Sequence, residues 1–327
     1  MPLTLLDVAK AHSSRAESAL IESVATYAPE LNAFPSEVIT DTEFDTLDRT
    51  QLPVTAFTNA NEGVAPGSSK YKVRKHQCHI FRGAVLADKA VADAFNLKRG
   101  AGRFQQIESE GVGRSALIEL GSQIYYGTDV DAKGFPGLRA IWDAHTAALV
   151  AAGQPGNAVG IDATGSSAGA ATSLYAVKFG DQFCKVIFGG SKVLKLPPFR
   201  EQSVTDANGG QYDAYVSNMV SWVGLQCANP YSVGRIYNLT AQAGKGLTDS
   251  LIADLLGKFP VGFTPDALFM SRQSRTQLQK SRTVVLQGNG KAGSIGSDSG
   301  LVAPMPTEAF GIPIITTDSI VNTEAIV

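Results

Sequence analysis

Residues 37–82 read EVITDTEFDTLDRTQLPVTAFTNANEGVAPGSSKYKVRKHQCHIFR, and the distribution of charge along this stretch decides the architecture. Its first part is acidic and its last part basic, with Glu37, Asp41, Glu43, Asp45 and Asp48 followed by Lys70, Lys72, Arg74, Lys75 and Arg82. Residues 59–69 between them have the Asn, Gly, Pro and Ser content of a turn. Strand-forming residues recur at every second position from 38 to 46. We therefore predict a long antiparallel hairpin that projects from the body.

A two-stranded ribbon is marginally stable in water unless something covers it, so the length of this hairpin indicates a partner. Its acidic and basic arms can pair with each other or across a contact between molecules. Pairs of this kind specify register more than they add stability.

Helical periodicity lies on both sides of the hairpin. Apolar residues recur at three- and four-residue spacing over residues 4–26, which predicts an amphipathic helix with Thr4 as its N-cap. Further helices are predicted over residues 87–95 and 103–125. Gly111 and Gly113 inside the long second helix indicate bending or close backbone packing.

The composition becomes rich in Ala, Gly and Ser over residues 147–171, where we place a domain junction. Beyond it the pattern predicts several strands and two helices. The strands are expected at 174–179, 185–188, 212–227 and 267–270, the helices after Thr248 and Ser271, a flexible loop at 288–300 and a last strand-like run at 310–320.

Composition excludes several classes of protein. The 327 residues are 44% hydrophobic and 18% charged, which argues against a disordered chain or a coiled coil. The net charge of −2 does not indicate a surface for nucleic acid or anionic membrane. No stretch is apolar enough to predict a membrane span, and the N-terminus lacks the pattern of a signal peptide, so we expect synthesis in the cytosol. Three widely spaced cysteines, Cys78, Cys184 and Cys227, are expected to be reduced and mostly buried.

The motif GSSAG at residues 165–169 fits a nucleophile elbow and would make Ser167 a catalytic nucleophile. Hydrolases with this elbow place their histidine after the serine, whereas every histidine here precedes it: His12, His76, His79 and His145. We therefore interpret the motif as a turn of small residues that begins a helix.

Other motifs also lack a required part. GNGKAG at residues 288–293 fits a dinucleotide loop, but the residues after it do not predict the helix that would hold a pyrophosphate. Strand alternation puts His76 and Cys78 on one face and His79 on the other, which argues against a metal site. The basic helix that follows Ser271 is interpreted as a solvated face. We predict no catalytic, cofactor or metal residues and no enzymatic activity.

Seven stretches spread over most of the chain carry a resemblance to a known family. In order they are TLLDVAK at Thr4, TYAPELNAFP at Thr26, RTQLPVTAFTNANEGVAP at Arg49, KAVADAF at Lys89, LGSQIYYGTDVDAKGFPGL at Leu120, LYAVKFG at Leu174 and GIPIITTDSI at Gly311. Taken together, the chain resembles the major capsid proteins of tailed bacteriophages with the Hong Kong 97-type fold.

The resemblance implies an α+β fold. Its expected parts are an N-terminal arm (1–33), an extended loop made by the hairpin and its adjoining strand (34–86), a peripheral domain with a long spine helix (87–146), an axial α/β domain (147–304) and a C-terminal strand region (305–327) that returns to the peripheral domain. Some relatives crosslink a Lys of the extended loop to an Asn elsewhere, a motif that is not matched here residue by residue.

The resemblance also implies a major capsid protein whose pentamers and hexamers assemble into an icosahedral head around double-stranded DNA, without sequence-specific binding. Expected partners are a separate scaffolding protein, because the arm begins almost at Met1, together with a portal and a decoration protein. Assembly is expected in the host bacterial cytoplasm, and the product in the virion. Contacts between subunits are predicted at Glu43, Asp45, Asp48, Asn59, Asn61, Glu62, Lys70, Lys72, Arg74 and Lys75.

Two alternatives stay open from the sequence. One is the shell protein of an encapsulin-like bacterial compartment, which resembles phage capsids but holds cargo enzymes. The other is a serine hydrolase that uses Ser167, which a fluorophosphonate probe would reveal.

Overall fold

The computed structural model describes residues 26, 28–100, 102–151, 159–191, 193–288 and 303–327. Across these residues, helices and strands are mixed in an α+β arrangement with three sheets. The helix predicted over residues 4–26 falls almost wholly outside the described residues. The loop predicted at 288–300, with its GNGKAG motif, lies outside them beyond Gly288.

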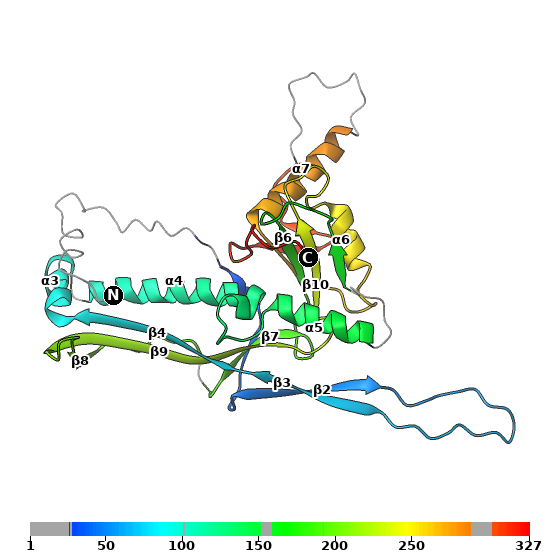
Figure 1. Cartoon of the computed structure of the whole chain (residues 1–327), viewed down its shortest axis with the longest axis horizontal. Helices are drawn as coiled ribbons and strands as arrows, with labels where there is room; N and C mark the ends of the chain where they lie inside the picture. The colour runs from blue at the N-terminus through cyan, green and yellow to red at the C-terminus, as the bar shows by residue number, and fades with distance from the viewer. Residues whose placement is uncertain (1–25, 27, 101, 152–158, 192, 289–302) are drawn as a thin grey trace.

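The predicted hairpin is confirmed. Strand β2 (Glu43–Gln51) pairs antiparallel with β3 (Lys70–Gln77), and the ribbon extends away from the rest of the molecule (Figure 1). The paired strands are shorter than predicted. Three of the ten charged residues that were assigned to the two arms lie outside these strands: Glu37, Asp41 and Arg82. The chain bends before β2 because the N–H of Ile39 bonds to Phe188 and the carbonyl of Asp41 accepts from Gly190.

A long sheet forms the extended half of the body. Its order is β1 (Ser36–Val38), β7 (Cys184–Gly189), β9 (Gln211–Cys227) and β4 (His79–Asp88), with β8 (Arg200–Thr205) also paired to β9. Helix α3 (Lys89–Arg99) begins at the N-cap Asp88, whose carboxylate accepts from the N–H of Ala90 at 2.8 Å. Helix α4 (Arg103–Tyr126) then runs along β4 and β9, so both predicted helices are confirmed (Figure 1).

The second body is built on a six-stranded sheet. Its order is β12 (Glu308–Ala309), β13 (Ile312–Thr316), β11 (Ala267–Met270), β6 (Thr172–Val177), β10 (Val233–Leu239) and β5 (Gly160–Asp162). Every residue of β6, β10 and β11 is buried, as expected for the centre of a covered sheet. Helices α6 (Asp249–Leu256) and α7 (Arg272–Gly288) pack with it, and Thr248 caps α6 as predicted.

Strand pairing crosses the domain boundary expected at residue 147. Strands β7, β8 and β9 belong to the range 147–304, yet they join β1 and β4 in the long sheet. In the C-terminal region, β13 pairs with β11 in the six-stranded sheet, while Glu324 bonds to Tyr126 at the end of α4. Pairing follows from which strand edges meet in space, and sequence proximity does not determine that.

Several shorter elements were not predicted. Helix α5 (Leu138–Ala151) buries Leu138, Trp142 and His145 at helical spacing, and β10 lies in a stretch that carried no strand prediction. Helix α2 (Glu30–Ala33) and the 3₁₀ turn η1 (Gly127–Asp129) complete the described helices. The turn at residues 165–170 leads into strand β6, so the helix predicted to begin there is wrong.

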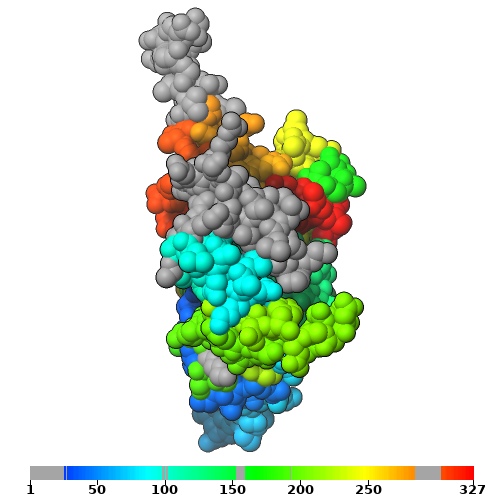
Figure 2. All heavy atoms as spheres, turned by 90° about the vertical axis from the view of Figure 1, so that its left-hand side faces the viewer, coloured from blue at the N-terminus to red at the C-terminus, as the bar shows by residue number. Residues whose placement is uncertain are grey.

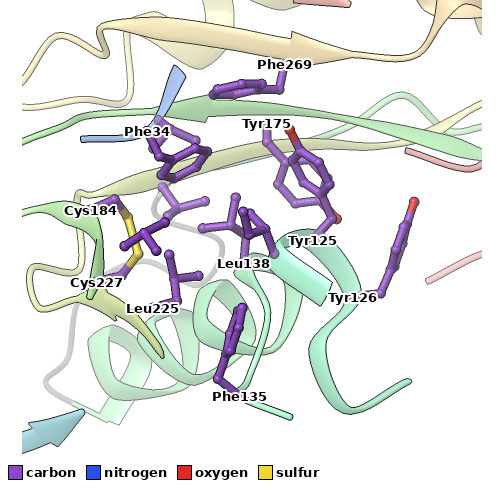
Figure 3. Close-up of a cluster of buried hydrophobic side chains, with 14 of the residues drawn as sticks. Phe34, Tyr125, Tyr126, Phe135, Leu138, Tyr175, Cys184, Leu225, Cys227 and Phe269 are labelled. Atoms are coloured by element: carbon purple, nitrogen blue, oxygen red, sulfur yellow. A yellow bond between two sulfur atoms is a disulfide. The ribbon is translucent and has the colours of Figure 1, made fainter. Parts of the chain in front are cut away.

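One continuous core joins both sheets with the end of α4 and with α5. Figure 3 shows Tyr125 and Tyr126 of α4, Tyr175 and Phe269 of the six-stranded sheet, and Leu225 of the long sheet around the same volume. The prediction of three reduced cysteines is corrected here, because Cys184 and Cys227 form a disulfide. They are directly paired on neighbouring strands β7 and β9, with Cα atoms 4.3 Å apart.

A buried ion pair lies beside this core. The Oε2 atom of Glu324 accepts from Arg235 at 3.0 Å and from Ser173 at 2.6 Å, and its Oε1 atom accepts from Tyr126 at 2.7 Å. The Arg235 guanidinium also lies near three aromatic rings, those of Trp142, Tyr175 and Tyr237. Residue 324 therefore ties the C-terminal segment to both the six-stranded sheet and α4.

Seen from the α3 end, the parts form successive layers (Figure 2). The hairpin lies at the bottom, the β8–β9 turn and α3 above it, and the six-stranded body at the top. Within the described ranges, none of the helices has the length and apolar character needed to cross a membrane.

Candidate assembly surface

The hairpin has two distinct faces, because side chains alternate along paired strands. Phe44, Thr46, Asp48, Arg74 and His76 are the half-buried residues of the inner face. The outer face is exposed and combines charge with apolar surface: Glu43, Asp45, Leu47, Arg49, Tyr71, Val73, Lys75 and Gln77. The outer face is therefore the surface that this chain leaves uncovered.

The predicted acidic and basic arms do meet, and register places Asp45 opposite Lys75 and Asp48 opposite Lys72. On the outer face Lys75 bonds to Glu43 at 3.0 Å, and this hydrogen bond and charge lower the pKa of Glu43 and raise that of Lys75. Both groups are exposed, so their pairing adds little to stability. Instead, the two side chains contribute to the pattern of positive and negative charge on the outer face.

At the hairpin root, Arg74 and Asp48 form a half-buried ion pair at 3.0 Å. The imidazole of His76 bonds to Thr46 on the same inner face. Helix α5 approaches this side: burial lowers the pKa of His145 to about 4, with Arg74 and His76 adding to the effect. Of the predicted contact residues, Asp48 and Arg74 thus pair with each other across the two strands, on the inner face of the hairpin.

A second attachment lies where β1 leads toward the hairpin. Lys185 of β7 is almost fully buried and forms ion pairs with Glu37 and with Asp181, the latter at 3.1 Å. Its ammonium lies 4.7 Å from the ring centre of Phe44 on β2. Glu37, predicted as part of the acidic arm, instead anchors the root.

Beyond the paired strands, residues 52–68 are all exposed. Asn59 and Glu62 bond across the tip through the side chain of Glu62, and Asn61 takes a left-handed backbone with φ of 69°. A turn lies at residues 59–62, the first part of the tip predicted at 59–69, and it contains three predicted contact residues: Asn59, Asn61 and Glu62.

The apolar part of this surface was not predicted from the sequence. Leu47 and Val73 are opposed on the outer face with exposed fractions of 68% and 54%, and Arg49 lies over the ring of Tyr71. Leu52, Val54 and Phe57 are also exposed along the distal loop. The available signal was apolar residues at alternate positions in a ribbon too narrow to bury them.

The motifs considered for chemistry have structural partners. In the GSSAG turn it is Ser166 that bonds to a side chain, that of Gln242. His79 bonds to the carbonyl of Lys133, His76 bonds to Thr46, and burial raises the pKa of the Cys78 thiol to about 11. Among the described residues, no group of three side chains is arranged to hold a metal ion.

The basic helix α7 is not a freely solvated face, which corrects that interpretation. Arg272 pairs with Asp318, Arg282 holds Asp249 with two hydrogen bonds, and Arg275 donates to the carbonyl of Pro306. These arginines fasten α6 and the residues around β12 and β13 to α7.

Comparison with known proteins identifies a family whose model matches this chain. A family model described as major capsid protein GP7 matches residues 29–327. No curated protein sequence matches the chain.

Among the solved structures with a similar fold are those of two bacteriophages. The near-atomic-resolution structure of bacteriophage epsilon15 is 19% identical, with a TM-score of 0.71 and coverage of 100% of this chain and 98% of that one. The capsid of bacteriophage JBD30 is 12% identical, with a TM-score of 0.52 and coverage of 91% and 93%. The expected Hong Kong 97-type capsid fold is confirmed by these similarities.

Proposed function

This chain belongs to the GP7 family of major capsid proteins, and from that membership we propose how its copies build a tailed-phage head. It is a structural shell protein of the virion and assembles with copies of itself. We propose that pentamers and hexamers close into an icosahedral shell, and that each hairpin packs on an adjacent subunit. The observation that carries the second part is the exposed outer face of the hairpin.

Within that scheme the two bodies have separate roles. We assign the six-stranded body to the axial position, around the symmetry axes, and the long sheet with α3 and α4 to the peripheral position. The support is the continuous shared core, which would hold the two bodies together as one subunit. Residues 184–227 then belong mainly to the peripheral part, since they pair with β1 and β4.

The contact surface on the hairpin is narrower than the predicted set. We propose that Glu43, Asp45, Lys70, Lys72 and Lys75, with the tip residues Asn59, Asn61 and Glu62, contact the neighbour. Asp48 and Arg74 are left to the root, where they pair with each other. Leu47, Tyr71 and Val73 supply the apolar area that the charged residues surround.

The contents and helpers of the shell follow from the same scheme. We propose that it encloses double-stranded DNA without reading its sequence, which suits a net charge of −2. A scaffolding protein, a portal and a decoration protein are the further partners, and assembly takes place in the host bacterial cytoplasm. The chain has no enzymatic role in this proposal. The family match favours a capsid over an encapsulin-like compartment, and the contents of purified shells, DNA or cargo protein, distinguish the two.

The test reverses exposed charge on the hairpin while sparing its root. Lys70→Glu with Lys75→Glu should leave the subunit folded, because both side chains are exposed and neither belongs to the Asp48–Arg74 pair of the root. Shell yield in electron microscopy should fall sharply, since an unfavourable contact recurs at every copy. Circular dichroism and thermal unfolding of the free subunit check the fold.

The matched control is Lys133→Glu with Lys195→Glu, which makes the same change in net charge on exposed residues of the body. It should assemble at nearly the wild-type yield. Wild-type shells from the hairpin variant, or equal loss from both variants, would remove the hairpin charges from the proposed contact.

A further inference from the structure

The turn between β12 and β13 combines two unfavourable features in one residue. Ala309 and Ile312 are paired directly, so Phe310 and Gly311 form a two-residue turn. Both have positive φ, 54° for Phe310 and 77° for Gly311. Turns of this type favour Asn, Asp or Gly at both positions, and a bulky aromatic residue with positive φ is an outlier.

The ring of Phe310 gains little from its own chain in exchange. It is 59% exposed, while the flanking Ala309 and Ile312 are 2% and 5% exposed and belong to the core. The position therefore strains the backbone and leaves an aromatic ring in water. Asn at this position would relieve both, because Asn tolerates this backbone and is well solvated.

Other residues with positive φ have a local explanation. Asn61 and Asn238 are of the type that adopts this backbone readily. Thr164 is held by a hydrogen bond from its N–H to Asp162 at 2.7 Å, and Ser191 by one to Ile39 at 2.8 Å. Strained residues without such a reason tend to lie at functional positions.

The surroundings of Phe310 fit a permanent contact between like chains. The turn lies at the edge of the six-stranded sheet, where β12 is the last strand. From Ala303 to Thr317 the sequence contains a single charged residue, Glu308, and Met305 is 47% exposed in the same segment. Depletion of charge with exposed Phe and Met is typical of the centre of homomeric interfaces.

We propose that Phe310 is an anchor that a second copy of this chain buries when shells form. The inference rests on the proposed assembly and adds a residue in the six-stranded body that the hairpin contact does not involve. Arg282 supports the position of the turn by donating to the carbonyl of Glu308 at 3.2 Å. The second copy would cover the ring, and the strained turn would hold it outward.

The decisive variant is Phe310→Asn, which suits the strained backbone and removes the ring. The free subunit should unfold at the same temperature as wild type or higher. The protein concentration needed for shells should rise about tenfold or more, because each contact loses a buried aromatic side chain. Phe310→Tyr, which keeps the ring, should assemble nearly as wild type.

Val261→Asn is the matched control, because Val261 is 102% exposed at another turn of the same body and has no positive φ. It should leave assembly unchanged. Phe310→Asn shells at the wild-type concentration would overturn the inference, and so would a lower unfolding temperature, which would mean that the ring stabilises its own chain. Wild-type protein that never assembles would overturn the proposed assembly and this inference together.

Discussion

The carboxyl group of Glu30 is fully buried where α2 meets α4 and the C-terminal segment. It accepts a hydrogen bond from Thr317, and its Oε2 atom has no hydrogen-bond partner among the described residues. Burial raises the pKa of Glu30 above its usual 4.5, although the bond from Thr317 acts in the opposite direction. Among the described residues, no basic side chain contributes to this shift.

This burial predicts a pH dependence of stability. The folded subunit holds the Glu30 proton more tightly than the unfolded chain, so its contribution to stability is complete below pH 4.5. That contribution decreases as the pH rises through the raised pKa of the folded state. Glu30→Gln should flatten this part of the pH profile in thermal unfolding of free subunits. Identical slopes for wild type and variant between pH 4.5 and 7 would contradict the prediction.

Two contacts between individual residues could not be predicted from the sequence. Cys184 and Cys227 are 43 residues apart, and only the pairing of β7 with β9 brings them together. Glu324 and Arg235 likewise lie 89 residues apart. Neither pairing could be predicted from the sequence, because such contacts depend on long-range strand pairing.

The glycines of helix α4 differ in their surroundings. Gly111 and Gly113 were expected to permit bending or close packing, yet a Cβ added at either would meet open space. A Cβ at Gly121 would lie within 3 Å of Ser319 Oγ and Glu30 Oε2. Close packing of α4 therefore occurs near its C-terminal end, against α2 and the C-terminal segment.

Alanine substitutions at these glycines should change the free energy of unfolding in opposite directions. Gly111→Ala and Gly113→Ala should each raise the free energy of unfolding by about 1 kcal/mol, because alanine is the better helix former. Gly121→Ala should lower it by about 1–3 kcal/mol through overpacking. Chemical denaturation of free subunits measures all three, and a stabilised Gly121→Ala would refute the packing argument.

Helices and strands with a clear hydrophobic period were predicted from the sequence, whereas short or fully buried elements were missed. The hairpin, α3, α4 and α6 follow from alternation, helical spacing and caps. Strand β10 was missed because it is buried along its whole length and shows no alternation. The charged residues of the hairpin were identified from the sequence. Which of them lie on the outer face and which lie at the root became clear only from the pairing register of β2 and β3.

The whole molecule is a capsid subunit with two exposed parts for which we propose contacts with neighbouring copies. The hairpin extends away from the body, and Phe310 projects from a strained turn at the edge of the six-stranded sheet. The order of segments in the sequence resembled a capsid protein, and the family match and the shared fold agree with it. Which strands belong to which body could not be read from the sequence, because β4 and β9 pair across more than a hundred residues.

The most direct test of the account is electron cryo-microscopy of the purified protein expressed with its neighbouring genes. We expect closed icosahedral shells in which the outer face of each hairpin, at Leu47, Tyr71 and Val73, is covered by an adjacent subunit. A monodisperse monomer under every salt, scaffold and concentration condition, or shells in which these side chains stay exposed to solvent, would contradict it.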